Sequence, residues 1–194
     1  IEGPATIGAV RLAGVLQDNR PMKVESLDVR TWNLPSAVAG VIGADVLRSY
    51  VVDVSFAPCR VRLSEAGRAP RFRGQMLALD WDQGRPTAQA AVSDDGRTLI
   101  GPFVIATGAN VPVRLADDLA QAPGAAKPEE LYPQGVWMAR LPGLSFAGVE
   151  MRNIPAGLMK PDGEAAGILG GGALARFRLR FDFPSGQLIV APAR

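Results

Sequence analysis

The 194-residue sequence contains no histidine and a single cysteine, Cys59. Without histidine, Ser-His-Asp and Cys-His catalytic centres are impossible, and most zinc sites are excluded as well. One cysteine cannot build a disulfide framework within the chain, and we expect Cys59 to be a small buried hydrophobic residue. The chemistry that remains is carboxylate acid–base catalysis, a Ser-Lys pair, or binding without catalysis. The three lysines show no Ser-x-x-Lys spacing, which argues against the second of these.

The sequence also lacks a strong charge imbalance and a long apolar run. Its net charge of +2 comes from scattered arginines, so nucleic-acid binding is not expected. No apolar run has membrane-spanning length. The 22 glycines and 16 prolines favour strands and turns, and 47% hydrophobic residues suffice for a core. The composition and the absent initiator Met favour a periplasmic or secreted location. No cofactor or metal is expected.

Two segments of the sequence repeat each other without a gap. Residues 39–47 read Ala-Gly-Val-Ile-Gly-Ala-Asp-Val-Leu, and residues 166–174, at an offset of 127 positions, read Ala-Gly-Ile-Leu-Gly-Gly-Gly-Ala-Leu. Each copy predicts a short apolar strand ending at glycine, one short helix, a half-buried strand, a turn and a closing strand. The sequence therefore predicts a duplicated β-rich unit.

The repeat divides the chain into three parts. Residues 1–63 form the C-terminal part of a first lobe, the polar residues 64–74 a linker, and residues 75–194 a second lobe. Hairpins with turns at residues 82–85 and 93–96 are predicted at the start of the second lobe.

A motif in the second lobe resembles a known family. Residues 103–110, Phe-Val-Ile-Ala-Thr-Gly-Ala-Asn, are similar to the signature of retropepsin-like and pepsin-like aspartic peptidases, in which apolar residues precede Asp-Thr-Gly-Ala-Ser. Residues 167–170 resemble that family's hydrophobic-hydrophobic-Gly segment, and residues 146–155 its Gly-to-Val-Pro strand pair. The resemblance implies a mostly β, bilobal acid-protease fold of closed barrels with one short helix per lobe.

The resemblance also implies a catalytic loop with one essential residue missing. Ala106 stands where the family has its aspartate, followed by Thr107 and Gly108. Such enzymes use two carboxylates, one per lobe, that share a proton across a water molecule. Alanine can neither activate the water nor protonate the substrate. The equivalent aspartate of the first copy is expected about 20 residues ahead of Ile1, so neither catalytic aspartate lies in the sequence.

Further residues receive roles from the same resemblance. Substrate contacts are expected from four residues: Ala109, Asn110, Tyr132 and Trp137. Support of the catalytic loops from behind is expected from four glycines: Gly40, Gly43, Gly167 and Gly170. The second flap is expected near residues 126–136, and residues 1–10 fall near the first flap, where their glycines suit a hairpin tip.

The sequence thus predicts an aspartic endopeptidase inactivated at Ala106, whether by an introduced substitution or in a natural pseudo-peptidase. The alternative is a non-catalytic module that binds a peptide or protein in the inter-lobe cleft. A third interpretation, an unrelated β-barrel, predicts that residues 39–63 and 166–190 differ in structure. The expected partners are a peptide or protein substrate, and an upstream fragment or second copy that completes the first lobe.

Overall fold

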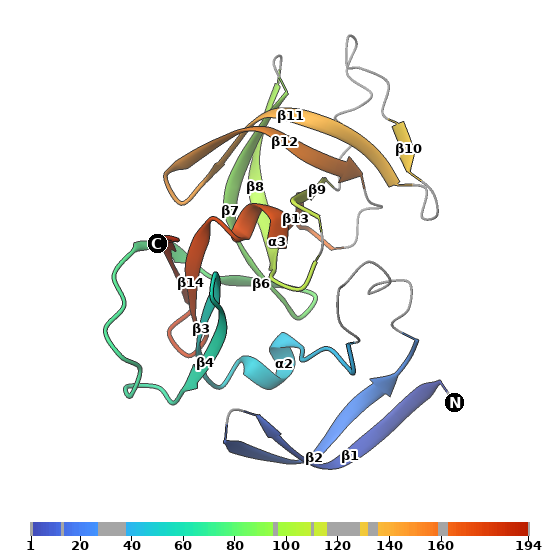
Figure 1. Cartoon of the computed structure of the whole chain (residues 1–194), viewed down its shortest axis with the longest axis vertical. Helices are drawn as coiled ribbons and strands as arrows, with labels where there is room; N and C mark the ends of the chain where they lie inside the picture. The colour runs from blue at the N-terminus through green and yellow to red at the C-terminus, as the bar shows by residue number, and fades with distance from the viewer. Residues whose placement is uncertain are drawn as a thin grey trace. The chain divides into compact units, whose positions relative to one another are not determined.

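The computed structural model describes residues 2–12, 14–26, 38–94, 97–109, 111–115, 129–131, 136–158 and 163–193. Contacts divide the chain into two compact units, Ile1–Gly43 and Ala44–Arg194. The fold is mostly β, as predicted. In the described ranges the α-helices are two single turns, α2 (Ala44–Leu47) and α3 (Gly171–Leu174) (Figure 1).

The first unit contains a long antiparallel hairpin of β1 (Gly3–Leu12) and β2 (Val15–Val24). Leu12 lies opposite Val15, and the chain reverses at Gly14, whose φ of +89° favours glycine. The prediction that the glycines of residues 1–10 form a hairpin tip is therefore wrong. Gly8 lies within β1, several residues before this reversal.

The β1–β2 hairpin repeats a hairpin of the second unit, formed by β11 (Val136–Phe146) and β12 (Val149–Leu158). Residues 13–15 and 147–149 both read Ala-Gly-Val. Four positions after each valine, Asn19 and Asn153 adopt left-handed φ values of 49° and 55°. The offset is 134 positions, seven more than in the other repeat, so the two copies do not align over their whole length without a gap.

Six strands of the second unit close into a barrel. Their order is β11-β12-β9-β13-β8-β7, and β7 pairs back onto β11 (Figure 1). The four not yet defined are β7 (Arg85–Asp94), β8 (Arg97–Ala106), β9 (Val113–Leu115) and β13 (Gly167–Gly170). Two short strands extend the sheet at its ends, β6 (Asp80–Asp82) and β10 (Glu129–Leu131).

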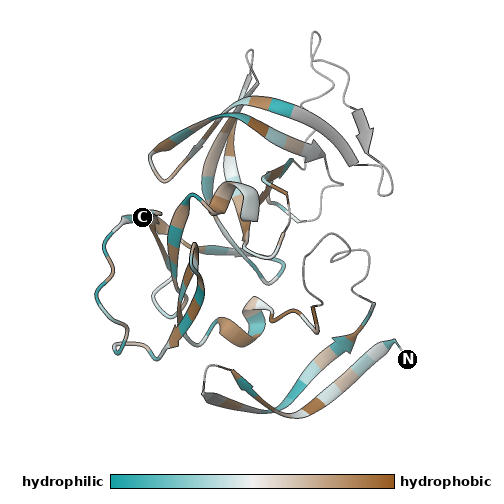
Figure 2. Ribbon diagram, viewed as in Figure 1, coloured by the Kyte–Doolittle hydropathy of each residue, from teal (hydrophilic) through white to brown (hydrophobic). Residues whose placement is uncertain are grey.

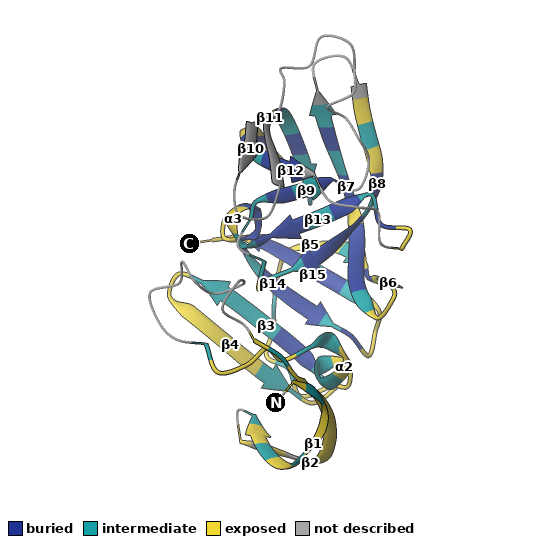
Figure 3. Cartoon of the chain, turned by 90° about the vertical axis from the view of Figure 1, so that its right-hand side faces the viewer, coloured by how far each residue is buried: buried dark blue, intermediate teal, exposed yellow. Residues whose placement is uncertain are grey.

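Apolar side chains fill the interior of the barrel, and their burial explains why the sheet closes. Phe103, Val92, Val113, Leu144 and Leu169 are all fully buried. Figure 3 shows buried residues in β8, which leads to the predicted catalytic loop, and in β13, which lies beside β8. Alternating inward-facing residues of this kind anchor the position at which each strand ends.

A five-stranded antiparallel sheet forms the other part of the second unit, in the order β4-β3-β14-β15-β5. Its strands are β3 (Val51–Phe56), β4 (Cys59–Ser64), β5 (Gln75–Ala78), β14 (Phe177–Asp182) and β15 (Gln187–Pro192). The hydropathy colouring of Figure 2 shows the apolar residues of these strands interleaved with polar ones. Cys59 is exposed at the start of β4, so the prediction that it is buried is wrong.

The two copies of the repeat fold alike. Helices α2 and α3 begin and end 127 residues apart. Val51 pairs with Ser64 across the first hairpin, and the equivalent residues, Arg178 and Ala191, pair across the second. The third interpretation, which required the two segments to differ in structure, is not supported at these elements.

The two copies are related by a local twofold axis. Strands β3 and β14 pair antiparallel with Asp53 opposite Arg180, and these two residues are equivalent in the repeat. The pairs on either side, Val52 with Phe181 and Val54 with Leu179, exchange under the same operation. An antiparallel ladder centred on equivalent residues requires a twofold axis through its centre.

The copies differ in the segment before the helix. Gly167–Gly170 forms strand β13 between β8 and β9, whereas residues 40–43 have no regular structure, so the strand predicted there is wrong. The predicted lobe boundary near residue 63 and the division at Gly43 describe different things. The first is based on the sequence repeat. The second is based on contacts, because β3 pairs with β14 and β4 pairs with β3.

Candidate functional site

The candidate catalytic loop begins where β8 ends. Ala106 is the last residue of β8 and is half-buried, Thr107 is half-buried, and Gly108 is exposed. The Ala109 N–H donates to the Ala106 carbonyl oxygen at 3.0 Å, which closes a tight turn over Thr107 and Gly108. None of residues 106–109 is ionisable. The loop itself therefore has no acid or base.

Strand β13 holds this loop in place. It lies between β8 and β9, so the chain from 107 to 112 must cross the end of β13 to reach β9. Two backbone hydrogen bonds fix the crossing: Gly170 N–H donates to the Pro112 carbonyl at 2.9 Å, and Gly171 N–H to the Ala109 carbonyl at 2.8 Å. Gly170 also lies beside Ala106 in the parallel ladder.

The crossing leaves no room for side chains at the glycines of β13. A Cβ on Gly170 would fall on the carbonyl oxygen of Val111, and one on Gly167 on that of Arg114. At Gly108 and Gly40, by contrast, a Cβ would meet no atom within 4 Å. Close approach of the backbone thus explains why residues 167 and 170 are glycine. Nothing in the described structure explains why Gly40 or Gly108 is glycine.

A Gly170→Ala substitution should therefore destabilise the second unit, because the loop from 106 to 112 must move away from β13. We expect a loss of about 1–3 kcal/mol in the free energy of unfolding, measured by urea denaturation. Gly108→Ala is the matched control and should change the free energy by less than about 0.5 kcal/mol. Equal effects of the two substitutions would contradict the packing argument.

The other predicted site residues are not assembled by the described structure. Asn110 and Tyr132 lie outside the described residues. Trp137 lies in β11 opposite Glu130, and its side chain is also outside them. Ala109 is half-buried beside the start of α3. Gly43 immediately precedes α2, as Gly170 precedes α3. The substrate-contact and first-copy support roles therefore stay predictions.

A second polar cluster, around Asp82 at the end of β6, was not predicted from the sequence. The Asp82 carboxylate accepts hydrogen bonds from Glu164 N–H at 3.0 Å, from Ala165 N–H at 3.3 Å and from Arg85 at 3.1 Å. The hydrogen bond from the Glu164 N–H is the main cause of the lowered pKa of Asp82; desolvation opposes it, and Ala165 and Arg85 lower the pKa further. Gly163, at φ +86°, has no space for a Cβ beside this carboxylate.

Asp82 ties the chain before β13 to the β6–β7 hairpin, so Asp82→Asn should destabilise the protein at neutral pH. A lowered folded-state pKa contributes stability above the unfolded value of 3.8, and this contribution is lost as the pH falls through the folded value. The difference from wild type, measured as thermal midpoints from pH 7 to pH 2, should therefore disappear in acid. Asp80→Asn, at an exposed neighbour, is the control and should change the thermal midpoint at pH 7 less than Asp82→Asn does.

A third polar cluster lies on the local twofold axis. Arg180, only 6% exposed, donates two hydrogen bonds to Asp53, at 2.6 and 2.8 Å, and a third to the Pro70 carbonyl at 2.7 Å. Its guanidinium carbon also lies 4.8 Å from the centre of the Phe72 ring. The sequence contained a signal for this pair, because Asp53 and Arg180 are equivalent residues of opposite charge.

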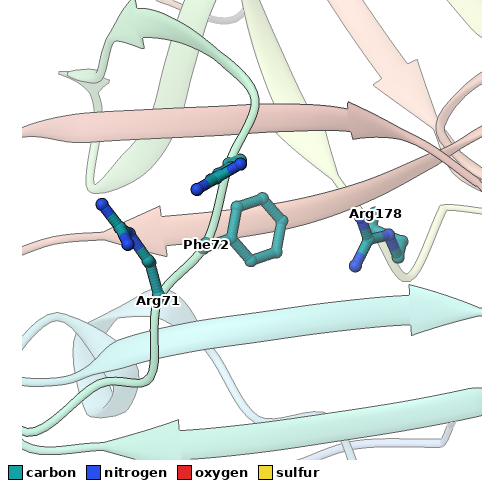
Figure 4. A pocket seen from close by; sticks show the side chains of 4 residues that line it. Arg71, Phe72 and Arg178 are labelled. Carbon is teal, nitrogen blue, oxygen red and sulfur yellow. The ribbon is translucent and has the colours of Figure 1, made fainter.

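Beside this cluster is a shallow hollow of about 260 Å³ lined by Arg71, Phe72, Arg73 and Arg178. Figure 4 shows Arg71 and Arg178 on opposite sides of the Phe72 ring, so their guanidinium groups do not converge on a common point. The Arg178 guanidinium carbon lies 5.4 Å from the ring centre. Arg178 therefore packs against Phe72, and it does not form an anion pocket together with Arg71.

The described ranges contain no group of three or more His, Cys, Asp or Glu side chains placed to hold a metal ion. No helix within them has the length and apolar character needed to cross a bilayer.

The chain was compared with known proteins. No protein-family model matches it, and no curated protein sequence matches it. Among solved structures, it is similar to a retropepsin-like aspartic protease from Rickettsia conorii, with 23% sequence identity and a TM-score of 0.44. The similarity covers 59% of this chain and 86% of that one.

Proposed function

We propose that this chain is the larger part of a two-lobed aspartic endopeptidase that is inactive because Ala106 replaces a catalytic aspartate. The local twofold axis between equivalent hairpins is the observation that best supports the proposal. A two-carboxylate site needs two equivalent loops related by such an axis. One of these loops follows β8 at Ala106, and its partner falls ahead of Ile1 with either the offset of 127 or the offset of 134 positions.

The proposed reaction is hydrolysis of a peptide bond by an activated water molecule. With aspartate at position 106, one carboxylate would take a proton from the water while the other protonates the carbonyl oxygen of the substrate. Two carboxylates at so short a distance cannot both ionise, so one of them stays protonated. Alanine at position 106 leaves one carboxylate alone, without the shared proton.

The neighbouring residues would position the site rather than react. The tight turn at Thr107 and Gly108, with the hydrogen bonds from Gly170 and Gly171, would hold position 106 at the end of β8. The open space around Gly108 leaves room for the backbone of an equivalent loop. Ala109, Asn110, Tyr132 and Trp137 remain the proposed substrate contacts.

The second candidate is a pseudo-peptidase that holds a peptide or protein partner in the same cleft. The absence of any ionisable residue from the otherwise intact loop at 106–109 favours it. The two candidates differ in what restoration of the carboxylate would do.

The decisive experiment is Ala106→Asp in a protein that includes the region ahead of Ile1, assayed for cleavage of an unfolded protein between pH 3 and pH 7. Cleavage that requires Asp at 106 would support the endopeptidase. Binding of the same substrate to both forms without cleavage by either would support the pseudo-peptidase.

A further inference from the structure

Arginines that are far apart in the sequence share one face of the five-stranded sheet. Side chains of directly opposed residues in antiparallel strands point to the same side, and so do alternate residues of one strand. Two neighbouring rows across β4, β3 and β14 therefore lie on one face. They are Arg60, Ser55 and Arg178 in one row, and Arg62, Asp53 and Arg180 in the other. Four of these six residues are arginine.

The segment between β4 and β5 adds two arginines to this face. Arg71 and Arg73, both exposed, come immediately before and after Phe72. The Phe72 ring packs over the sheet, with its centre 5.4 Å from the guanidinium carbon of Arg178 and 4.8 Å from that of Arg180. Arg71 and Arg73 line the same hollow as Arg178. Three separate parts of the chain thus bring arginines to one face.

Five of the six arginines carry a charge that no acidic residue balances. Arg180 is paired with Asp53. The other five form no ion pair with a described residue, and we call them the arginine face: Arg60, Arg62, Arg71, Arg73 and Arg178. Asp182, one row beyond Arg180, accepts a hydrogen bond from the Ser185 N–H at 3.2 Å. The chain has a net charge of +2, so the chain without these five charges would have −3. Positive charge is therefore concentrated on this face.

The geometry of the arginine face limits its partner. Neighbouring strands are about 4.8 Å apart and alternate residues of one strand about 7 Å, so the guanidinium groups spread over a surface. Arg71 and Arg178 lie on opposite sides of the Phe72 ring and do not converge (Figure 4). One small anion cannot bind them all. A partner that engages the whole face must itself present many separate negative charges.

We propose that the arginine face binds the surface of a bilayer that contains anionic phospholipids. Each lipid moves laterally, so its phosphate can pair with a guanidinium wherever that group lies, and arginine binds phosphate through two parallel hydrogen bonds. An acidic peptide has charges at fixed spacing. On this face it would also find no free backbone groups on β3 or β14, because those groups are used within the sheet. A fluid partner therefore fits the spread of charges better.

An exposed apolar residue on the same face supports a lipid partner. Met76 of β5 lies opposite Ile189, which lies opposite Arg180, so Met76 points to the side of the arginines. Met76 is 56% exposed. A surface that combines basic and apolar side chains is typical of binding at a membrane surface, where apolar groups enter the headgroup region and cations pair with anionic lipids. Such binding would not depend on peptide hydrolysis.

Vesicle sedimentation tests the proposal with the 194-residue chain. The vesicles contain phosphatidylcholine with an equal part of phosphatidylglycerol, or phosphatidylcholine alone. At about 0.05 M salt, where charges interact over more than about 10 Å, the protein should sediment with the first vesicles and stay in solution with the second. Raising the salt to about 0.5 M should release most of the protein, because screening then acts within about 4 Å.

Matched charge variants locate the binding surface. Arg60→Gln with Arg62→Gln should lower the partition coefficient about 25-fold, since each basic side chain near an anionic surface contributes about fivefold. Arg140→Gln with Arg152→Gln changes the net charge equally, at exposed residues of the β11–β12 hairpin in the barrel. This control should lower the partition coefficient less than about threefold. Circular dichroism checks that both variants are folded.

Three results would overturn the proposal. The first is wild-type protein that stays in solution with the phosphatidylglycerol vesicles at low salt. The second is an equal loss in the two pairs of variants, because overall charge and not this face would then drive binding. The third is a protein that binds poly-glutamate or a single-stranded oligonucleotide through Arg60 and Arg62 but does not bind vesicles. An Ala106→Asp protein that failed to cleave peptides would overturn the proposed function and leave these vesicle results unaffected.

Discussion

In a protein that includes the region ahead of Ile1, Ala106→Asp should convert an inactive peptidase into one that cleaves unfolded protein in acid. A positioned acid–base group typically contributes about 10²–10⁴-fold to a rate, so we expect a gain of at least that size in the rate of hydrolysis. The backbone at position 106 is already fixed by its place beside Gly170 at the end of β8. The substitution then has only to supply the carboxylate, which half-burial of Ala106 accommodates.

The control for this gain is Ala106→Asn, which has nearly the shape of aspartate and cannot ionise. It should stay inactive, and Asp at 106 should give a bell-shaped pH profile whose two limbs belong to the carboxylate pair as a unit. Activity of the asparagine variant, or a profile without an acid limb, would show that position 106 is not part of a carboxylate dyad.

The repeat was the strongest signal in the sequence, because it predicted a helix followed by a hairpin in each copy. Helices of one turn at residues 44–47 and 171–174, each followed by a hairpin, are present as the matched segments indicated. Glycine turns were equally informative: the predicted turn at residues 82–85 has left-handed φ values at Gln83 and Gly84. Turn conformations of this kind depend on the local sequence more than on distant parts of the fold.

Features that depend on long-range neighbours were not predictable in the same way. The motif at 39–43 resembles that at 166–170, yet only the second is a strand, because β8 and β9 lie on either side of it. Cys59 was expected inside a core, but it lies on the edge strand β4, where no described strand covers it. Whether these positions form a strand or become buried depends on the neighbouring strands. The sequence of one segment does not specify those neighbours.

The loop at residues 106–109 and the glycines of β13 lie together, and the catalytic and supporting roles that the family resemblance gave them stay predictions. The ion pair on the axis was not predicted, because similarity between equivalent residues of a repeat does not indicate where they carry complementary charges. Identical charges at Asp53 and Arg180 would face each other across the axis and repel, so the two copies must differ there.

That ion pair gives the second large effect. Asp53→Ala should lower the free energy of unfolding by about 3–5 kcal/mol, because it leaves the buried Arg180 guanidinium without its counter-charge. The Pro70 carbonyl and the Phe72 ring, its remaining partners, carry no charge that could compensate. Urea denaturation measures the loss. Arg178→Met removes a neighbouring cation from the same ring and should cost less than about 1 kcal/mol.

Exchanging the two charges tests the axis itself. Asp53→Arg alone places two guanidinium groups at one point and should destabilise the protein more than Asp53→Ala does. The double substitution Asp53→Arg with Arg180→Asp should recover most of the loss, because the local twofold axis makes the two backbone positions equivalent. Recovery should be incomplete, since Pro70 and Phe72 contact residue 180 alone. A double variant no more stable than Asp53→Arg would mean that the two positions are not equivalent. That result would contradict the local twofold axis between β3 and β14.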